Sequence, residues 1–253
     1  MQRYFLTEQT PNHHSTEIVL QDEQYHHMIR VMRMKEKDQV ILVLPDQTAF
    51  KAEINEILEA EVHLTWVADE TQSKELPVQV TIASGLPKGD KLEWIVQKGT
   101  ELGANAFLPF KSEYAIVKWD HKKAAKKQER LSKIAQEAAE QAHRTKMPEV
   151  KAVATFNELL QQSEEYDFCL VAYEENAKNG EMHNFRSVLN QLEPGHTVLI
   201  VFGPEGGLSP MEINQLEERN FTVCSLGPRI LRTETAPLYA LSAISFATEL
   251  NGL

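Results

Sequence analysis

Two loops rich in glycine and proline carry the residue types best suited to chemistry in this chain of 253 residues. The first, FGPEGGLSP at residues 202–210, follows the apolar run Thr197–Phe202. The second, LGPRILRTETAP at residues 226–237, follows the apolar run Phe221–Leu226. Parallel strands of an open sheet present ligands at their carboxyl ends. We therefore expect one site built from two neighbouring loops.

The first loop favours a particular class of ligand. Its glycines, Gly203, Gly206 and Gly207, permit close backbone approach, and Pro204 stiffens the turn. The loop lacks the Gly-Lys-Ser/Thr ending of a phosphate-binding loop, and Glu205 would repel a phosphate. Exposed amides beside an acid instead suit a ligand with a cationic centre and adenine and ribose groups. For this loop alone, a tight strand-to-helix connection without a ligand stays open.

The second loop adds a dense set of polar side chains to otherwise apolar surroundings: Arg229, Arg232, Thr233, Glu234 and Thr235. Arg232 and Glu234 could simply form a surface ion pair, which contributes little to stability. The presence of two such loops favours a ligand site over two unrelated turns.

Alternating strands and helices are expected to position these loops. Short, strongly apolar runs are typical of a parallel sheet covered on both faces, so we predict an α/β fold. Ser209 and Glu212 form a capping box at the start of the helix after the first loop. The last helix, Pro237–Leu250, is too apolar for a solvated helix and should pack in a core or a subunit interface. The other expected elements are a strand at 78–82, helices Lys91–Leu102 and His121–Ala142, and strands Ala106–Phe110 and Phe168–Ala172.

The N-terminal part of the chain has a different pattern. Gln39–Leu44 and Val62–Val67 are strand candidates, and residues 50–58 mix strand alternation with helical character. A short helix is expected over Asp22–Val31, with Asp22 as its N-cap. The polar stretch 69–75 is a plausible linker. We therefore divide the chain into a β-rich domain, residues 1–72, and an α/β domain, residues 73–253.

Charge is distributed unevenly along the chain. The net charge is −11, yet residues 76–151 carry 14 Lys and Arg against 9 Asp and Glu. Such a basic island can hold phosphates whatever the total charge of the protein. A solvated face of a lysine-rich helix is the alternative.

Several classes of protein are disfavoured. The chain has no apolar run long enough for a membrane span and no signal-peptide pattern at its start. Cys169 and Cys224 cannot form a disulfide framework and indicate buried thiols in a reducing compartment, the cytoplasm. The histidine pairs His13–His14 and His26–His27 lack zinc-ligand spacing, and adjacent residues point in different directions, so we expect no metal.

The two loops together resemble those of the 16S ribosomal RNA (uracil-N3) methyltransferases of the SPOUT class. The strings MQRYFL and HHMIRVMRMKEKDQV are similar to that family's PUA-like RNA-binding domain, and LPKGDKLEWIVQKGTELG and EQAHRTKMPEV to its middle motifs. The resemblance implies a SPOUT-like, trefoil-knotted α/β domain with a mostly parallel sheet, after a small PUA-like β-barrel domain. It also implies S-adenosyl-L-methionine as cofactor, a homodimer, and 16S ribosomal RNA or the small ribosomal subunit as partner.

Carried over by position, the resemblance assigns the cofactor site to the two loops and to the end of the strand Phe168–Ala172. Residues 172–175 would form the third and least motif-like cofactor segment. The implied cofactor-binding residues are Ala172, Phe202, Gly203, Pro204, Glu205, Gly206, Gly207, Leu226, Gly227, Ile230, Leu231, Thr235 and Ala236.

Methylation of uracil N3 requires the loss of a weakly acidic proton, so the site needs a base or a group that stabilises the anion. We expect Arg232 to stabilise the anion or orient the base, and Glu234 to act as base or orienting group. The target base must be unpaired or flipped out, because N3 lies on its Watson–Crick edge. The residues expected to bind RNA are Arg3, Arg30, Arg33, Lys88, Arg144 and Lys146.

Two other functions stay open. A SPOUT enzyme that methylates a ribose 2′-oxygen or a transfer RNA would carry similar cofactor loops. A non-catalytic RNA-binding protein with a relic pocket is the second alternative, although the intact glycines and the Arg232–Glu234 pair favour an enzyme.

Overall fold

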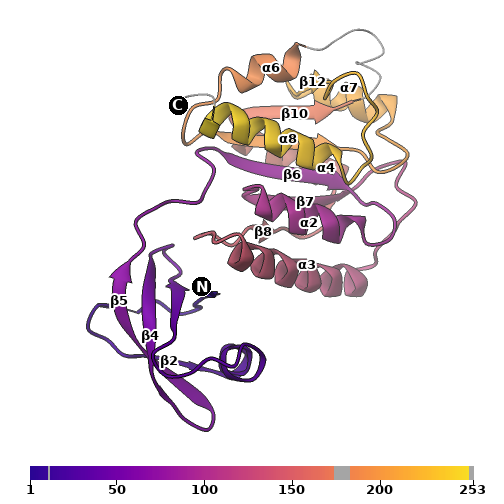
Figure 1. Ribbon diagram of the computed structural model, residues 1–253. Coiled ribbons are helices and arrows are strands. Elements are labelled where there is room, and N and C mark those ends of the chain that lie inside the picture. Colours follow the sequence, from indigo (N-terminus) through magenta and orange to yellow (C-terminus); the bar gives the residue numbers. More distant parts are fainter. Residues whose placement is uncertain (11, 174–182, 251–253) are drawn as a thin grey trace. The chain divides into compact units, whose positions relative to one another are not determined.

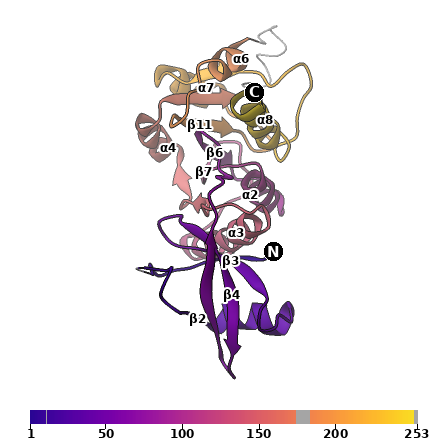
Figure 2. The ribbon, with the colours of Figure 1, turned by 60° about the vertical axis from the view of Figure 1, so that its left-hand side comes forward.

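The structure is a computed structural model that describes residues 1–10, 12–173 and 183–250. The chain divides into two compact units (Figures 1 and 2). The N-terminal unit comprises residues 1–74 and 139–147, and the C-terminal unit comprises residues 75–138 and 148–253. Segment 139–147, the end of one long helix and the loop after it, thus belongs with the first 74 residues, an association that the sequence pattern did not indicate.

A five-stranded sheet forms the N-terminal unit, in the order β1-β3-β4-β5-β2. β1 and β3 are parallel, and the other neighbours are antiparallel. Residues 50–58, whose pattern was mixed, lie in a strand apart from Leu58, because alternate residues such as Phe50, Ala52 and Ile54 are buried. The elements are β1 (Arg3–Phe5), β2 (Ile18–Gln21), α1 (Asp22–Tyr25), a π-helix (His26–Val31), β3 (Gln39–Val43), β4 (Ala49–Ile57) and β5 (Glu61–Asp69).

The expected helix over residues 22–31 is present as one α-turn followed by a π-helix. The prediction that Asp22 caps it is wrong. Gln21 is the N-cap and makes no side-chain cap, while Asp22 lies inside the helix with a φ of 51°. Met28, which is fully buried, anchors the segment to the core of this unit.

A parallel sheet forms the C-terminal unit, in the order β12-β10-β11-β6-β7-β8, with β9 paired to β7. The predicted α/β fold is confirmed. The elements are β6 (Gln79–Gly85), α2 (Lys91–Glu101), β7 (Ala106–Lys111), α3 (His121–Gln141), β8 (Glu149–Val150), β9 (Ala154–Thr155), α4 (Phe156–Gln162), a 3₁₀ turn (Ser163–Glu165), β10 (Phe168–Ala172), α6 (Asn184–Leu189), β11 (Thr197–Phe202), α7 (Pro210–Glu218), β12 (Thr222–Cys224), α8 (Ala236–Ser245) and a π-helix (Phe246–Leu250).

Helices cover both faces of this sheet, as the apolar strands predicted. Along β11, Val198 and Ile200 pack into a core with α2, α3, α6 and α8. The alternate residues Leu199 and Val201 pack with α4 and α7 on the other face. Figure 2 shows α4 and α7 on one side of the sheet and α2 and α8 on the other. The strands are therefore held from both sides, and the loops at their ends have rigid supports.

The last helix packs in a core, as predicted. Ala240, Leu241 and Ile244 of α8 are buried, and Leu241 lies beside Gly99 of α2. The chain thus leaves β12 at one edge of the sheet and returns across its face to α2 (Figure 1). The trefoil knot itself stays a prediction. Within the described ranges, no helix combines the length and the apolar character that crossing a membrane requires.

Candidate cofactor site

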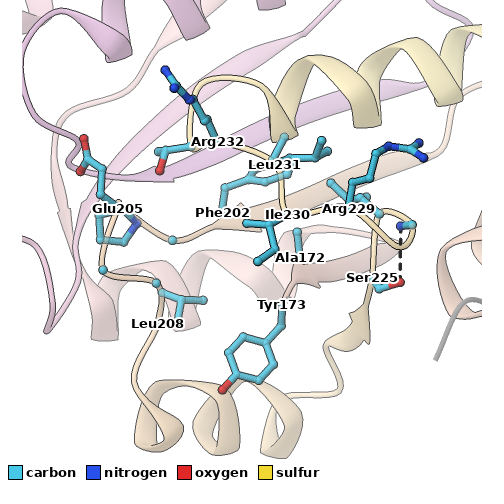
Figure 3. A pocket seen from close by; sticks show the side chains of 18 of the residues that line it. Ala172, Tyr173, Phe202, Glu205, Leu208, Ser225, Arg229, Ile230, Leu231 and Arg232 are labelled. Atoms are coloured by element: carbon cyan, nitrogen blue, oxygen red, sulfur yellow. Dashed lines mark hydrogen bonds between the residues drawn. The ribbon is translucent and has the colours of Figure 1, made fainter. Parts of the chain in front are cut away.

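A pocket of about 730 Å³ lies within the C-terminal unit, at the carboxyl ends of β10, β11 and β12 (Figure 3). This is the edge at which an open parallel sheet binds its ligands. The volume falls in the range of pockets that enclose small molecules and cofactors. Its lining comprises Lys91, Ala172, Tyr173, residues 202–208, residues 225–233 and Ala236.

The loop after β11 is held in one conformation by close packing. A Cβ atom on Gly203 would come within 2.8 Å of the backbone of Gly207, so a side chain would not fit there. Gly85, at the end of β6, leaves room for Pro204, since a Cβ at that position would lie 2.6 Å from the proline ring. The backbone of the loop can therefore fold tightly and face the pocket.

The predicted capping box fixes the end of this loop. The Ser209 hydroxyl accepts from the Glu212 amide at 3.2 Å, and the Glu212 carboxylate accepts from the Ser209 amide at 2.8 Å. The same carboxylate accepts from the Glu113 amide at 2.9 Å. These bonds join the start of α7 to the segment after β7. They are shielded from solvent, because Glu212 is only 5% exposed.

Hydrogen bonds also shape the loop after β12. The Tyr173 amide donates to the Cys224 carbonyl at 3.0 Å, which joins the ends of β10 and β12. The Gly227 amide lies 3.5 Å from the buried Ser225 hydroxyl, the contact drawn in Figure 3. The Arg232 carbonyl accepts from the Thr235 and Ala236 amides at 2.8 and 3.0 Å and so starts α8.

Lys91, the first residue of α2, joins the two loops electrostatically. Its ammonium lies 2.9 Å from Glu205 Oε1 and 3.6 Å from Glu234 Oε2. The hydrogen bond to Glu205 raises the pKa of Lys91. Burial raises the pKa of Glu205, but the hydrogen bonds from Lys91 and from the backbone outweigh it and hold that pKa below its usual range. Glu205 is therefore a carboxylate paired with a cation at the rim of the pocket.

The predicted cofactor residues come together. Except for Thr235, every residue assigned to the cofactor from the sequence lines this pocket. Of the third segment, Ala172 and Tyr173 line the pocket, while residues 174 and 175 lie outside the described residues. The predicted catalytic residue Arg232 lines it as well. Glu234 does not, but its Oε2 is buried close to Lys91 and makes no hydrogen bond within the described part of the chain.

Some residues that line the pocket were not predicted to do so from the sequence. Lys91 belongs to a helix that begins more than a hundred residues before the loops, and it appeared only as part of the basic island. Leu208, Ser225 and Pro228 lie within or beside the predicted loops. Their place in those loops was the available signal, whereas only the topology could bring Lys91 to the site.

The residues predicted to bind RNA fall into two groups. Arg30, Arg33 and Lys88 are exposed, and Lys146 is half-buried. Arg3 and Arg144, in contrast, are only 1% and 2% exposed. Within the N-terminal unit, Arg3 donates to the Arg144 carbonyl at 3.0 Å and pairs with Glu70. Neither arginine offers a surface to a phosphate, so we retain the RNA prediction for the other four.

Two adjacent histidines do not behave as expected. The side chains of His13 and His14 were predicted to diverge, but both reach Asp69 at the end of β5. The prediction of divergence is wrong for this pair, because the loop between β1 and β2 is neither helix nor strand. In the other pair, His26 is exposed while His27 lies 3.0 Å from the Tyr4 hydroxyl.

Comparison with known proteins gives matches over nearly the whole chain. A family model described as an RNA methyltransferase domain matches residues 74–245, and one described as an RNA methyltransferase PUA domain matches residues 20–64. The ribosomal RNA small subunit methyltransferase E of Bacillus subtilis is 52% identical over 252 residues, which cover 99% of this chain and 98% of that protein.

Solved structures agree with this similarity. The crystal structure of a hypothetical protein, 48% identical, covers 98% of this chain and 99% of its own, with a TM-score of 0.92. The ribosomal RNA small subunit methyltransferase E of Neisseria gonorrhoeae, bound to S-adenosyl methionine, is 28% identical over 97% of each chain, with a TM-score of 0.83. A Legionella pneumophila protein in complex with the bound cofactor SAM is also 28% identical over 97% of each chain, with a TM-score of 0.84.

Proposed function

This chain belongs to the family of ribosomal RNA small subunit methyltransferases E. We propose that it methylates N3 of a uridine in 16S ribosomal RNA, with S-adenosyl-L-methionine as methyl donor. The observation that carries the proposal is the pocket formed by the two loops at the carboxyl ends of β11 and β12. A relative with the same fold has been solved with this cofactor bound.

The residues of the pocket fit such a ligand. The cradle at Gly203 has no room for a Cβ, so backbone groups rather than side chains face the ligand there. Leu226, Ile230 and Leu231 supply apolar contact for an adenine ring, and the Glu205–Lys91 pair holds the rim of the pocket. The bound cofactor would contribute an electrophilic methyl group on a sulfonium.

The protein's own residues must then position the acceptor and manage a proton. We assign Arg232, which is exposed at the rim of the pocket, to stabilise the negative charge that develops over the uracil carbonyl oxygens. We assign Glu234 to accept the N3 proton or to orient the base. Lys91, 3.6 Å away, keeps a positive charge beside that carboxylate. Transfer requires alignment of donor and acceptor, which the rigid loops favour.

RNA recognition is assigned to both units. We propose residues 1–72 as a PUA-like RNA-binding domain and residues 73–253 as the catalytic domain, with Arg30, Arg33, Lys88 and Lys146 as phosphate contacts. The target uridine must be unpaired or flipped, since N3 lies on the pairing edge. If these four residues neutralise phosphates, affinity for RNA falls steeply as the salt concentration rises.

We also propose that the protein acts as a homodimer in the cytoplasm. Tyr239, Phe246 and Leu250 are 42%, 59% and 59% exposed, although the helical segment that carries them is buried on its opposite side. Their spacing places them on one stripe, which a partner subunit would cover. Sedimentation of wild type and of Phe246→Glu tests this, because a monomeric wild type would exclude it.

The decisive experiment is a methylation assay with labelled S-adenosylmethionine and small ribosomal subunits, or 16S RNA, from cells that lack this gene. Digestion to nucleosides identifies the product. Labelled 3-methyluridine supports the proposal, whereas a 2′-O-methyl nucleoside or labelled transfer RNA would assign a different reaction to the same fold. Absence of both label and cofactor binding would favour the non-catalytic RNA-binding protein.

Arg232→Ala tests the assigned role of that side chain. Removing a donor that stabilises developing charge costs roughly 10²-fold in turnover. Cofactor affinity, measured by calorimetry, should change far less. Arg219→Ala serves as control, because Arg219 pairs with Glu164 at the surface and lies outside the pocket. Equal losses of turnover and cofactor affinity in Arg232→Ala would overturn the assignment.

A further inference from the structure

Three side chains of the N-terminal unit, none of which has been given a functional role above, converge on one point. His13 and His14 lie in the loop between β1 and β2, and Asp69 is the last residue of β5. Each offers one ligand atom, and these three atoms lie within 4.8 Å of one another. Among the residues that the structure describes, no other group of histidine, cysteine and acidic side chains is gathered in this way.

The distances suit a small metal ion. His14 Nε2 lies 3.1 and 3.3 Å from the two Asp69 carboxylate oxygens, and His13 Nε2 lies 3.6 Å from Oδ1. Two ligand atoms at about 2.1 Å from a tetrahedral zinc ion are about 3.4 Å apart. The observed separations lie on both sides of that value, so an ion could contact all three groups after small adjustments.

Neighbouring aromatic rings hold the three side chains in place. The His13 ring stacks on Phe50 with centroids 4.6 Å apart, and the His14 ring meets Trp66 edge-on at 4.8 Å. The Trp66 indole N–H donates to Asp69 Oδ1 at 2.8 Å. Metal ligands are typically oriented by such outer contacts, in particular by hydrogen bonds to the ligating carboxylate.

Ion pairing between the imidazoles and Asp69 explains only part of this arrangement. His14 makes a hydrogen bond to the carboxylate, but His13 Nε2 is buried and has no hydrogen-bond partner among the residues that the structure describes. A buried nitrogen without a partner is costly, and coordination to a cation would satisfy it. The ring of His13 also faces the carboxylate rather than solvent, as its 16% side-chain exposure indicates.

We propose that His13 Nε2, His14 Nε2 and the Asp69 carboxylate bind a divalent transition-metal ion of the Zn²⁺ class. Two imidazoles and one carboxylate are a ligand set that this class of ion prefers over Mg²⁺ or Ca²⁺. The ion would join the loop between β1 and β2 to the end of β5, residues that are 55 positions apart in sequence. Its role would be structural, because a bound ion that the unfolded chain does not hold stabilises the folded unit.

The site is tested by titrating the metal-stripped full-length protein with Zn²⁺ in a calorimeter. We expect one ion per chain and a rise in the unfolding temperature when Zn²⁺ is added. His14→Ala and Asp69→Asn should abolish both effects, and Trp66→Phe should weaken binding about tenfold, because it removes the outer hydrogen bond. His26→Ala is the matched control, since His26 is exposed in the same unit and is not part of the cluster.

Each outcome decides the proposal. His14 is 55% exposed, so its replacement should leave the circular-dichroism spectrum unchanged and any loss of Zn²⁺ binding would be local. Absence of saturable binding by wild type overturns the proposal. So does binding that persists in both His14→Ala and Asp69→Asn, because the ion would then be held elsewhere. Methyl transfer is measured separately, and its failure would leave this result intact.

Discussion

The pocket of the C-terminal unit and the histidine cluster of the N-terminal unit are assembled in opposite ways. The pocket is lined mainly by two short, continuous stretches, residues 202–208 and 225–233. The cluster joins side chains that are 55 positions apart, brought together by the path of a loop past an antiparallel strand. A site built from consecutive residues leaves a motif in the sequence, whereas one built by tertiary contact does not.

The same contrast applies to the charged residues of the two units. At the pocket, Lys91 and Glu205 belong to the lining, Glu234 lies 3.6 Å from Lys91, and all three side chains remain partly accessible. In the N-terminal unit, Arg3 is buried and pairs with Glu70 and with a backbone carbonyl. Charged side chains thus lie at the candidate ligand site in one unit, whereas in the other a buried charged pair holds segments of the unit together.

The largest effect is expected from Arg3→Met. The change keeps an apolar stem but leaves Glu70 and the Arg144 carbonyl without their partner. Breaking a buried pair in this way costs about 3 kcal/mol. Urea unfolding should show the loss, while Arg33→Met, at an exposed position, should stay near wild type. If Arg3→Met instead weakened RNA binding at unchanged stability, the contrast between the two units would fail.

Much of the C-terminal unit could be predicted because its signals are local. The runs Phe168–Ala172 and Thr197–Phe202 are strands with the predicted bounds, and the Ser209–Glu212 capping box is present. In these elements, hydrophobic pattern and capping chemistry indicate the same structure. The loops after β11 and β12 could therefore be placed at one sheet edge from the sequence alone.

The remaining features depend on tertiary contacts. Three features could be predicted only by knowing which segments meet. They are the burial of Arg3, the orientation of His13 and His14 toward one carboxylate, and the approach of Lys91 to Glu205. Asp22 illustrates a local failure: its residue type favours a cap, but the N-cap is Gln21, and Asp22 has a left-handed φ of 51°. Residue type alone does not determine backbone conformation at such positions.

Gly203→Ala addresses the claim that backbone shape builds the pocket. The added Cβ would lie 2.8 Å from the Gly207 backbone, which cannot move as a flexible side chain would. Overpacking of this kind costs about 1–3 kcal/mol, and we expect cofactor affinity to fall at least about tenfold. Calorimetry with S-adenosylmethionine measures it.

Gly195→Ala is the matched control for that substitution. Gly195 has a φ of 94°, and a Cβ added there would have no atom of the described residues within 4 Å. The change therefore strains the backbone by roughly 1–2 kcal/mol, at a position away from the pocket. Stability should fall while cofactor affinity is kept. Wild-type affinity in Gly203→Ala would show that the loop tolerates a different shape.

Lys91→Gln tests whether charge supports the pocket that the backbone builds. The substitution removes the cation shared by Glu205 and Glu234. Because the Lys91 ammonium is accessible to solvent, the pair contributes little, and we expect at most a fewfold loss in cofactor affinity. Lys98→Gln, whose side chain pairs with Glu101 on the same helix, should have no such effect. A loss as large as that of Gly203→Ala would make charge, not backbone shape, the main determinant of the pocket.

The smallest expected effect concerns the pH dependence of the N-terminal unit. His63 lies 3.1 Å from Glu61 and 3.0 Å from Glu17. The hydrogen bond to Glu61 is the largest cause, and the one to Glu17 the second largest, that raises the pKa of His63 above 6.5. A raised pKa in the folded state means that the stabilisation is complete below about pH 6.5 and is lost as pH rises through the folded value. The free energy of unfolding should therefore differ between wild type and His63→Gln more at about pH 6 than at about pH 8.5. A difference that is independent of pH would show that His63 acts through packing and not through its charge.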